Sequence, residues 1–406
     1  MYKEISIDTK QLLNSIEEFS SFGKTEKNGV TRLALSRADV EVREHFRKVC
    51  ESIGMVLTYD DIGNMYGTLA GKNNDIPPIV MGSHLDTVEK GGKFDGSIGI
   101  IIGIEVVRAL VKNNITPEMP ITVVNFTNEE GARFEPAMMS SGILAGQFDK
   151  DEMFTSSDSK GVTFKDALKK SGFQGMISNR LNKATAFIEL HIEQGPVLET
   201  ESLQIGIVDG VVGMVNYEIE VMGESNHAGT TPMHLRKDAL FTTIDLIKKL
   251  RTNLDELDNE LVYTIGRMNI TPNIHTVIPN KVVFTIEARH KDENVINKVE
   301  SILNLLDIEL NDIKIKKQWG RNTVDFNEEI VNKIEVITKR LEYSYKKITS
   351  GAGHDAQFIS TYIPTAMIFI PSVNGISHSE KELTLEKDCI AGANVLLQTV
   401  LDIVVN

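Results

Sequence analysis

Apolar residues recur at helical spacing near the start of the chain. Side chains at positions i, i+4 and i+7 share one face of an α-helix, so this spacing predicts two amphipathic helices. The second is expected to end before Gly54, because glycine is typical of a helix terminus. The apolar positions are Leu12, Ile16 and Phe19 in the first helix, and Val42, Phe46, Val49 and Ile53 in the second.

Four short apolar runs bounded by turn residues follow, with helical stretches such as Gly103 to Val111 among them. Short runs that are apolar throughout are typical of strands buried in a parallel sheet. They predict an α/β fold with a mixed, mainly parallel sheet flanked by helices. A polar stretch at 148–182, with one helical piece at Phe164 to Lys170, is expected to run over the surface. The four runs are Pro78 to Met81, Ile121 to Phe126, Ala186 to Leu190 and Ala366 to Ile370.

Between about residues 213 and 319 apolar and charged positions alternate instead, as in Tyr217 to Val221. Alternation predicts half-exposed antiparallel strands, and two helical stretches complete the order strand, helix, strand, strand, helix, strand. We expect a small two-layer α+β domain of ferredoxin-like type at 211–320. It would be inserted into a larger domain formed by 1–210 and 321–406.

Composition and charge limit the classes of function. The 406 residues exceed what a single hydrophobic core usually supports, which agrees with two domains. Hydrophobic residues at 41% and charged residues at 25% are typical of a globular protein. Lys and Arg number 43 against 57 Asp and Glu, and the resulting net charge of −14 argues against binding of nucleic acid through its phosphates.

Cysteine content and hydropathy indicate the compartment. Cys50 and Cys389 are too few for a disulfide framework or a thiolate metal cluster, and they fit a reducing compartment, so we expect the cytoplasm. The start of the chain lacks the apolar segment of an export signal. The most apolar run, Ile98 to Val111, is interrupted by Glu105 and Arg108. We expect no membrane partner.

Potential metal ligands follow each of the four predicted buried strands. They are His84, the pair Glu129 and Glu130, His191 and, after a loop, His378. Ligands of open α/β sheets bind outside the carboxyl ends of the strands, so these side chains are expected to converge. A fifth candidate, Asp95, lies in the glycine-rich loop Gly91 to Gly96.

Five side chains are the number that a two-metal site needs. Two ions about 3.5 to 4 Å apart share one bridging carboxylate and a bridging hydroxide, and each takes two further protein ligands. We expect Asp95 to bridge, with His84 and His191 on one ion and Glu130 and His378 on the other. Three histidines and two carboxylates favour zinc, with manganese, cobalt or nickel as alternatives. A single histidine after a strand is more often a hydrogen-bonded loop residue, and only the joint placement indicates a metal site.

Two further carboxylates belong to the same stretches. Glu129 is predicted to be the general base that takes a proton from the attacking water, since a metal-flanked cleft raises a carboxyl pKa toward neutrality. The alternative is a supporting role for Glu130 or a neighbouring histidine. Asp86 is expected to orient the imidazole of His84 by accepting its other N–H.

Six motifs stand in order along nearly the whole chain. They are GSHLDTVEKGGKFDGSIG from Gly82, NEEGARF from Asn128, ELHIEQGPVLE from Glu189, ESNHAGTTPM from Glu224, SGAGHDA from Ser350 and IPSVNGISHS from Ile370. Together they resemble the M20 family of dinuclear metallopeptidases and amidohydrolases. The resemblance is strongest to the hydantoinase/carbamoylase branch, because His191 stands within HIEQGP where the peptidase branches typically carry a carboxylate. That branch includes N-carbamoyl-L-amino acid hydrolases, β-ureidopropionases and allantoate amidohydrolases.

The resemblance implies a zinc-peptidase-like catalytic domain with the metal ligands above and Glu129 as the base. It also implies that the inserted domain is a lid through which two copies form a homodimer. His227 matches a lid histidine that polarises the scissile carbonyl across the dimer, and Arg289 matches an arginine that clamps the substrate carboxylate. An ordinary surface histidine and a salt-bridging arginine are the alternatives. Gln194 and His354 fall in motifs that line the substrate site.

The chain departs from the branch at two positions. Thr276 stands where the family usually has an asparagine that helps to hold the substrate, and threonine is shorter and offers one donor in place of two. Glu287 replaces the aspartate common two residues before the lid arginine. The hydrolytic reaction is expected to be the same as in the family, but the tail of the substrate is expected to differ.

The expected function is metal-assisted hydrolysis of a linear ureido or amide C–N bond. The favoured activity is that of an N-carbamoyl-L-amino acid hydrolase, which releases the amino acid, ammonia and carbon dioxide. An allantoate amidohydrolase is the near alternative, and an aminoacylase or dipeptidase is more remote. A metal-binding protein without catalytic activity is the alternative from another class, and the complete ligand set with Glu129 argues against it.

Overall fold

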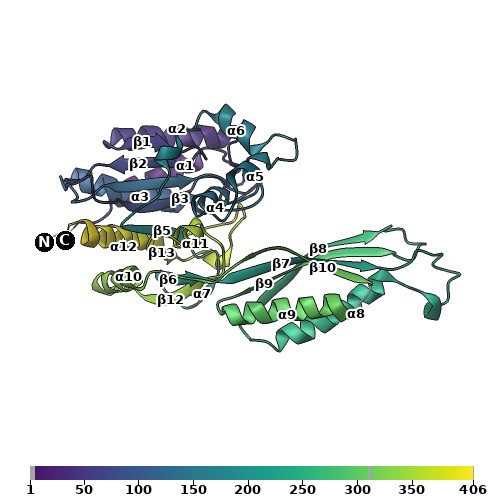
Figure 1. Cartoon of the computed structure of the whole chain (residues 1–406). Coiled ribbons are helices and arrows are strands. Elements are labelled where there is room, and N and C mark those ends of the chain that lie inside the picture. The colour runs from purple at the N-terminus through teal and green to yellow at the C-terminus, as the bar shows by residue number, and fades with distance from the viewer. Residues whose placement is uncertain (1–4, 310–311, 406) are drawn as a thin grey trace. The chain divides into compact units, whose positions relative to one another are not determined.

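The computed structural model describes residues 5–309 and 312–405 and divides into two compact units. The first unit comprises Met1–Gly210 and Asp325–Asn406, and the second comprises Val211–Val324 (Figure 1). The second unit ends at Val324 and not at residue 320, because strand β10 (Ile313–Arg321) continues its pairing with the rest of the unit as far as Arg321.

A sheet of nine strands, counted over the described residues, forms the centre of the first unit. Its order is β1-β2-β4-β3-β5-β13-β6-β11, with β12 paired to β6. The four central strands β4, β3, β5 and β13 are parallel, whereas β1, β2 and β6 pair antiparallel. The strands are β1 (Val56–Tyr59), β2 (Met65–Leu69), β3 (Ile79–His84), β4 (Ile121–Phe126), β5 (Ala186–Ile192), β6 (Ile205–Val211), β11 (Val324–Asp325), β12 (Tyr345–Ser350) and β13 (Thr365–Ile370).

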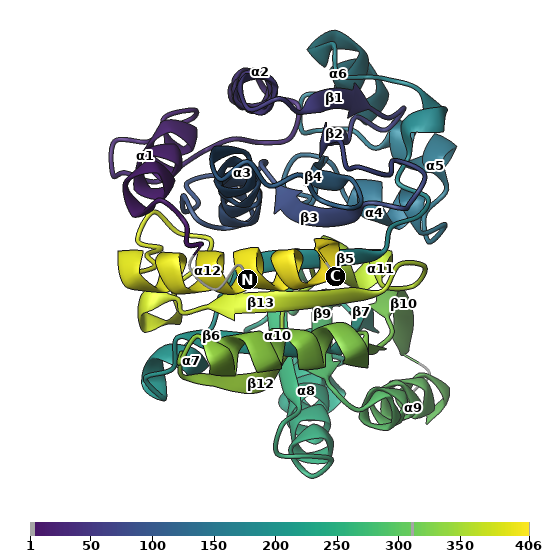
Figure 2. The ribbon, with the colours of Figure 1, turned by 90° about the vertical axis from the view of Figure 1, so that its left-hand side faces the viewer.

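Helices flank this sheet, and the predicted mixed α/β sheet is thereby confirmed (Figure 2). α3 packs against β3, β4 and β5, α12 packs against β5 and β13, and α1 contacts both of these helices. The helices are α1 (Thr9–Ser20), α2 (Arg37–Ser52), α3 (Ser97–Lys112), α4 (Met139–Leu144), α5 (Lys150–Thr155), α6 (Phe164–Ser171), α7 (Val197–Thr200), α10 (Glu328–Arg340), α11 (Asp355–Ile359) and α12 (Glu386–Val404), with short 3₁₀ turns at Ile177–Asn179 and Val373–Gly375.

The four central strands are buried at every residue. Continuous burial explains why most residues of these strands are apolar, and why the strands could be predicted from sequence. β3 and β5 are longer than predicted, so that His84 is the last residue of β3 and His191 lies inside β5. The stretch 148–182 was predicted less well: besides the expected α6 it contains α5, and both helices bury phenylalanines in a hydrophobic cluster with Phe134.

The second unit is a four-stranded antiparallel sheet of order β10-β7-β9-β8. Helices α8 (Ala239–Asp255) and α9 (Glu293–Glu309) lie together on one face of it (Figure 1). Burial alternates along β7 (Gly213–Met222) and β9 (Lys281–His290), as the sequence pattern predicts. The remaining strand is β8 (Val262–Thr271), and a 3₁₀ turn spans Met233–Leu235.

Candidate metal centre

The parallel strands bring the predicted ligands to one edge of the large sheet. His84 ends β3, His191 is the sixth residue of β5, Glu129 and Glu130 follow β4, and His378 follows β13. Because β4, β3, β5 and β13 are neighbours with a common direction, their carboxyl ends lie at the same edge. The loop before α3 places Asp95 among these side chains.

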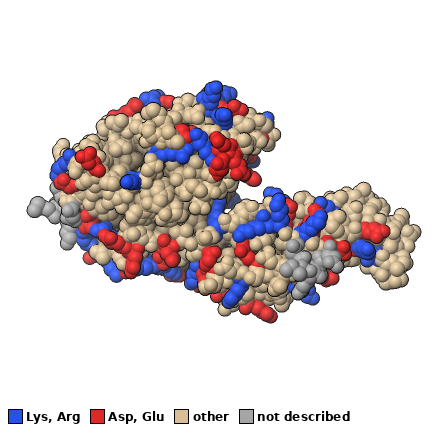
Figure 3. Space-filling view, viewed as in Figure 1, with Lys and Arg blue, Asp and Glu red and all other residues tan. Residues whose placement is uncertain are grey.

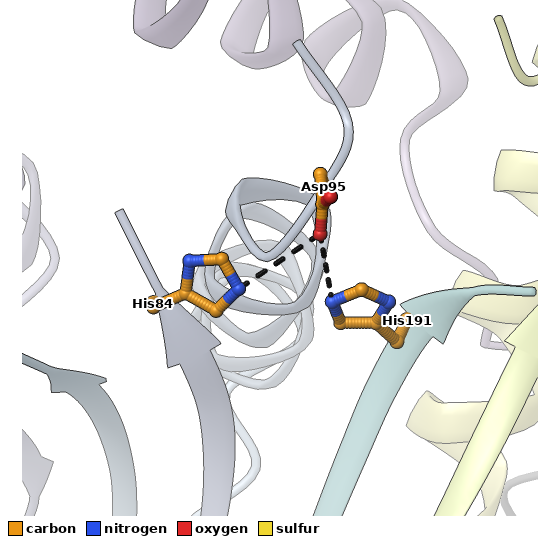
Figure 4. Close-up of side chains that lie close together, drawn as sticks. All are labelled: His84, Asp95 and His191. Carbon is orange, nitrogen blue, oxygen red and sulfur yellow. Dashed lines mark ion pairs between the residues drawn. The ribbon is translucent and has the colours of Figure 1, made fainter. Parts of the chain in front are cut away.

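The carboxylate of Asp95 stands between two groups of ligands. Its Oδ1 lies 3.2 Å from Nε2 of His191 and 3.9 Å from Nε2 of His84 (Figure 4). Its Oδ2 lies 3.2 Å from Nε2 of His378, which is in turn 3.3 Å from Oε2 of Glu130. Each carboxylate oxygen of Asp95 therefore faces a different pair of protein ligands.

Hydrogen bonds to backbone carbonyls orient two of the imidazoles. Nδ1 of His84 lies 2.8 Å from the backbone oxygen of Asp86, and Nδ1 of His191 lies 2.9 Å from that of Ile192. A carbonyl oxygen only accepts, so Nδ1 carries the hydrogen in both rings and Nε2 of the neutral ring presents its lone pair to Asp95. A lone pair that faces a carboxylate oxygen requires a cation or a proton between them, and this is the usual arrangement of histidine metal ligands.

Negative charge is concentrated around these histidines. Burial, together with the charges of neighbouring carboxylates, raises the pKa of Glu129 and of Glu130 well above the usual value. Oε1 of Glu130 is buried without a hydrogen-bond partner. Divalent cations would relieve this repulsion and satisfy the orphaned oxygen, so the donor set fits divalent metal ions. The buried carboxylates are Asp86, Asp95, Glu129, Glu189 and Asp355, with a 4% exposed Glu130 side chain beside them.

Asp95 affects the pKa values of the two nearest imidazoles to different extents. Burial lowers the pKa of His191, but the interaction with Asp95 outweighs burial and raises it to about 9. Burial lowers the pKa of His84 to about 4, and Asp95, which is more distant from this ring, does not offset the decrease.

Asp86 contacts the candidate metal centre through both its backbone oxygen and its carboxylate. The sequence predicts that Asp86 orients His84, and it does so through its backbone oxygen and not through its side chain. The carboxylate instead accepts the backbone N–H groups of Glu129 and Glu130, each at 3.2 Å. It therefore fixes the turn that presents the predicted base, whose Oε2 lies 3.5 Å from Nε2 of His84.

The backbone around the centre adopts conformations that few residues favour. Asn128, Gln194 and His378 have positive φ angles of 60°, 57° and 53°. Gly96, with φ of 61°, has no room for a side chain, since a Cβ there would lie 2.3 Å from the His84 ring. Unfavourable backbone conformations of this kind are held by the surrounding structure and concentrate at functional sites.

Comparisons with known proteins agree with this geometry. The model of peptidase family M20/M25/M40 matches residues 80–402. The chain belongs to this family. It is 36% identical over 406 residues to an N-carbamoyl-L-amino-acid amidohydrolase of Rhizobium meliloti, covering 98% of this chain and 96% of the relative. It is also 36% identical to an allantoate amidohydrolase of Escherichia coli K12, covering 93% of this chain and 93% of that protein.

A solved structure of the same branch has the same fold. The crystal structure of a hydantoinase/carbamoylase family amidase from Burkholderia multivorans superposes with a TM-score of 0.90 at 37% identity, covering 99% of both chains. Within the described part of this M20 chain, no helix combines the length and the hydropathy needed to cross a bilayer. On the face drawn in Figure 3, basic and acidic side chains are intermixed.

Two other residues predicted to line the M20 site lie beside the candidate metal ligands. Nε2 of Gln194 donates a hydrogen bond of 3.0 Å to Oδ2 of Asp95. The ring of His354 packs edge-on against that of His191, with centroids 4.6 Å apart, and its Nε2 lies 3.0 Å from Oγ of Ser350. His354 is only 2% exposed, and burial lowers its pKa well below the usual value. Contact of either residue with substrate stays a prediction.

The remaining predicted residues belong to the second unit. His227 forms an isolated β-bridge with Val277, and the backbone N–H of Ala228 donates to the backbone oxygen of Thr276. Arg289 lies on the half-exposed face of β9, and its Nε and Nη2 donate to Oε1 of Glu287 at 2.8 and 2.6 Å. The roles of His227, Thr276 and Arg289 towards a substrate stay predictions.

Sequence reasoning missed several buried groups that hold the ligands in place. Glu189 accepts a hydrogen bond of 2.6 Å from Ser83 and one of 3.1 Å from the backbone N–H of Ala356. The position of this glutamate inside the apolar run Ala186 to Leu190 was a sequence signal that could have identified Glu189 as a buried polar group. Arg43 donates to Thr127, immediately before the Asn128 turn, at 3.0 Å.

Arg43→Met is expected to lower the free energy of unfolding by about 3–5 kcal/mol, because it leaves the carboxylate of Asp39 buried without its partner. Both side chains are 0% exposed, and Nε of Arg43 lies 2.7 Å from Oδ2 of Asp39. Denaturant unfolding measures the loss. Arg47→Met on the same helix is the control, since its pairs with Glu44 and Glu51 are partly exposed and contribute about 0–1 kcal/mol. Equal losses in the two variants would contradict the prediction.

Proposed function

We propose that this M20 protein is an amidohydrolase that cleaves a linear ureido or amide C–N bond, with N-carbamoyl-L-amino acids as substrates. The observation that carries the proposal is the carboxylate of Asp95, whose two oxygens face two separate ligand pairs beside the buried Glu129. Relatives named N-carbamoyl-L-amino-acid amidohydrolase, similar over 98% of this chain, support the choice of substrate.

The proposed cofactor is two divalent metal ions. His84, His191 and Asp95 would hold one ion, and Asp95, Glu130 and His378 the other; the ligand atoms within each group lie within 4.8 Å of one another. Three histidines with two carboxylates favour zinc, with manganese, cobalt or nickel as alternatives. Such ions, when bound, supply a Lewis acid that acidifies water and polarises a carbonyl oxygen.

Glu129 is the proposed general base. Burial and the neighbouring carboxylates raise its pKa well above the usual value, so it is able to accept a proton from water and to release it again. As the water oxygen bonds to the carbonyl carbon, Glu129 takes the proton and delivers it to the departing nitrogen as the C–N bond breaks. Cleavage of one C–N bond of an N-carbamoyl amino acid leaves a carbamic acid. Its remaining C–N bond breaks when it decomposes, so the final products would be the free amino acid, ammonia and carbon dioxide.

The second unit is proposed to be a ferredoxin-like lid domain through which two copies form a homodimer. Its order of elements, β7-α8-β8-β9-α9-β10, supports this assignment. His227 is the proposed group that stabilises the tetrahedral oxyanion, and Arg289 the proposed clamp for a substrate carboxylate. Thr276 is the proposed contact to the tail of the substrate, and the cytoplasm is the proposed compartment.

Allantoate amidohydrolase is the second candidate. The Escherichia coli relative of that name is as similar in sequence, at 36%, as the Rhizobium meliloti N-carbamoyl-L-amino-acid amidohydrolase. Allantoate also offers ureido groups and a carboxylate, so the same site chemistry applies to it.

A substrate panel tests the proposal. The full-length protein, reconstituted with zinc or manganese, is expected to release ammonia from N-carbamoyl-L-amino acids at least tenfold faster than from allantoate, and N-acetyl amino acids and dipeptides are expected to give less still. N-carbamoyl-D-amino acids serve as the stereochemical control, with amino acid release as a second readout. Preferred hydrolysis of allantoate would establish the second candidate, and activity on dipeptides alone would exclude both.

A further inference from the structure

The loop that carries Asp95 is held by a carboxylate from the far end of the chain. Oε1 of Glu382, 6% exposed, accepts the backbone N–H groups of Phe94 at 3.0 Å and of Asp95 at 3.1 Å. Phe94 and Asp95 precede Glu382 by 288 and 287 residues in the sequence. Neither helix nor strand constrains the backbone at Phe94 and Asp95, so these hydrogen bonds fix the part of the loop from which the Asp95 side chain projects.

A hydroxyl links the same two carboxylates. Oγ of Ser377 lies 2.9 Å from Oε2 of Glu382 and 3.1 Å from Oδ2 of Asp95. Since a hydroxyl has one hydrogen, Ser377 donates to only one of them at a time. Ser377 also immediately precedes His378, so Glu382 is connected both to the carboxylate between the ligand pairs and to the turn that presents one histidine.

Gly92 provides the room for this arrangement. A Cβ at Gly92 would lie 1.9 Å from Oε1 of Glu382, so any side chain there would displace the carboxylate. Glu382 differs from an ordinary loop glutamate, because it is buried beside the carboxylate of Asp95 and accepts hydrogen bonds from two backbone N–H groups and a hydroxyl. Burial of a carboxylate is unfavourable unless hydrogen bonds replace those lost from water, so these bonds hold Glu382 against the loop.

We propose that Glu382 is a positioning residue for the metal centre: it sets the orientation of Asp95 between the two ligand pairs and thereby the affinity for metal ions. The inference rests on the metal centre of the proposed function. Glu382 need not touch a metal ion or substrate in this role, since it acts through the backbone of Phe94 and Asp95 and through Ser377. Groups that orient metal ligands typically change metal affinity by about 10–100-fold when they are removed.

The test compares the metal affinity of full-length variants. Apoprotein is titrated with Zn²⁺ in competition with a chromophoric chelator, and the absorption spectrum of Co²⁺-loaded protein reports the geometry of the ligands. Glu382→Gln keeps the shape of the side chain and is expected to weaken Zn²⁺ binding by about 10–100-fold and to alter the Co²⁺ spectrum. Ser377→Ala, which keeps the bonds from Glu382 to the loop, is expected to cause a smaller loss and keeps the test valid if Glu382→Gln destabilises the apoprotein.

Glu386→Gln is the matched control, because this exposed glutamate lies in the first turn of α12, four residues away. It is expected to leave both affinity and spectrum unchanged. Zn²⁺ affinities within twofold of the wild type in both Glu382→Gln and Ser377→Ala, with an unchanged Co²⁺ spectrum, would overturn the proposal. Failure of the proposed function is a separate result: it would appear as absence of substrate turnover in the wild type, while the comparison of metal affinities remains valid.

Discussion

Replacing Glu129 with glutamine is expected to lower kcat by about 10²–10⁴-fold while the protein keeps its metal ions. Glutamine has nearly the same shape as glutamate but does not take a proton from water at neutral pH. The backbone N–H of residue 129 would still donate to Asp86, so the surrounding turn is expected to keep its conformation although the residue is only 8% exposed. Ammonia release measures kcat, and elemental analysis of the dialysed protein measures the metal content.

The control for this variant is Glu118→Gln, which changes a half-exposed glutamate whose partner is Lys72. It is expected to leave both kcat and metal content unchanged. Wild-type turnover in Glu129→Gln would exclude Glu129 as the base. Loss of metal together with turnover would instead indicate that Glu129 supports Glu130 or His84.

Replacing Asp95 with alanine is expected to remove metal ions from both ligand groups and to reduce turnover below detection. The reason is geometric, since Oδ1 of Asp95 faces His84 and His191 whereas Oδ2 faces His378. His378→Ala, by contrast, removes a ligand from one group only. His378→Ala is expected to lose about one equivalent of metal per chain, whereas Asp95→Ala is expected to lose about two.

Elemental analysis after gel filtration measures these stoichiometries. Asp75→Ala is the matched control, because this aspartate is exposed in a loop of the same unit. It is expected to bind as much metal as the wild type. Retention of the full metal content by Asp95→Ala would rule out a carboxylate shared between two ions.

The convergence of the candidate metal ligands could be predicted from sequence, because it depends on strand order alone. β3, β4, β5 and β13 are buried throughout and mainly apolar, and a candidate ligand lies at or after the end of each. A parallel arrangement is sufficient to bring such residues together, whatever the detailed packing. The prediction therefore did not require any side-chain conformation to be known.

The groups that orient those ligands could not be predicted in the same way. Glu382 stands in the charged sequence SEKE, which resembles a solvated loop, and its partners Phe94 and Asp95 are almost three hundred residues away in sequence. The carboxylate of Asp86 was assigned to the wrong partner, since sequence spacing does not distinguish a backbone oxygen from a side-chain oxygen. Such contacts depend on backbone angles, among them the positive φ of Asn128.

The outer strands of the large sheet were missed for a different reason. β1 and β2 are short, and β1 alternates between exposed and half-buried residues, so neither resembles a continuous apolar run. In the second unit the same alternation was long enough to be recognised, because β7 and β9 each extend over ten residues.

The wide separation of the ligands along the chain also constrains when the centre is able to form during synthesis. Asp95 emerges early, but Ser377, which contacts its carboxylate, follows 282 residues later, after the whole second unit has been made. Contacts this distant in sequence form slowly, because the ends of a long chain must first meet. A nascent chain therefore lacks the complete set of candidate ligands until its last segment has docked, and bound metal ions would then stabilise the finished fold.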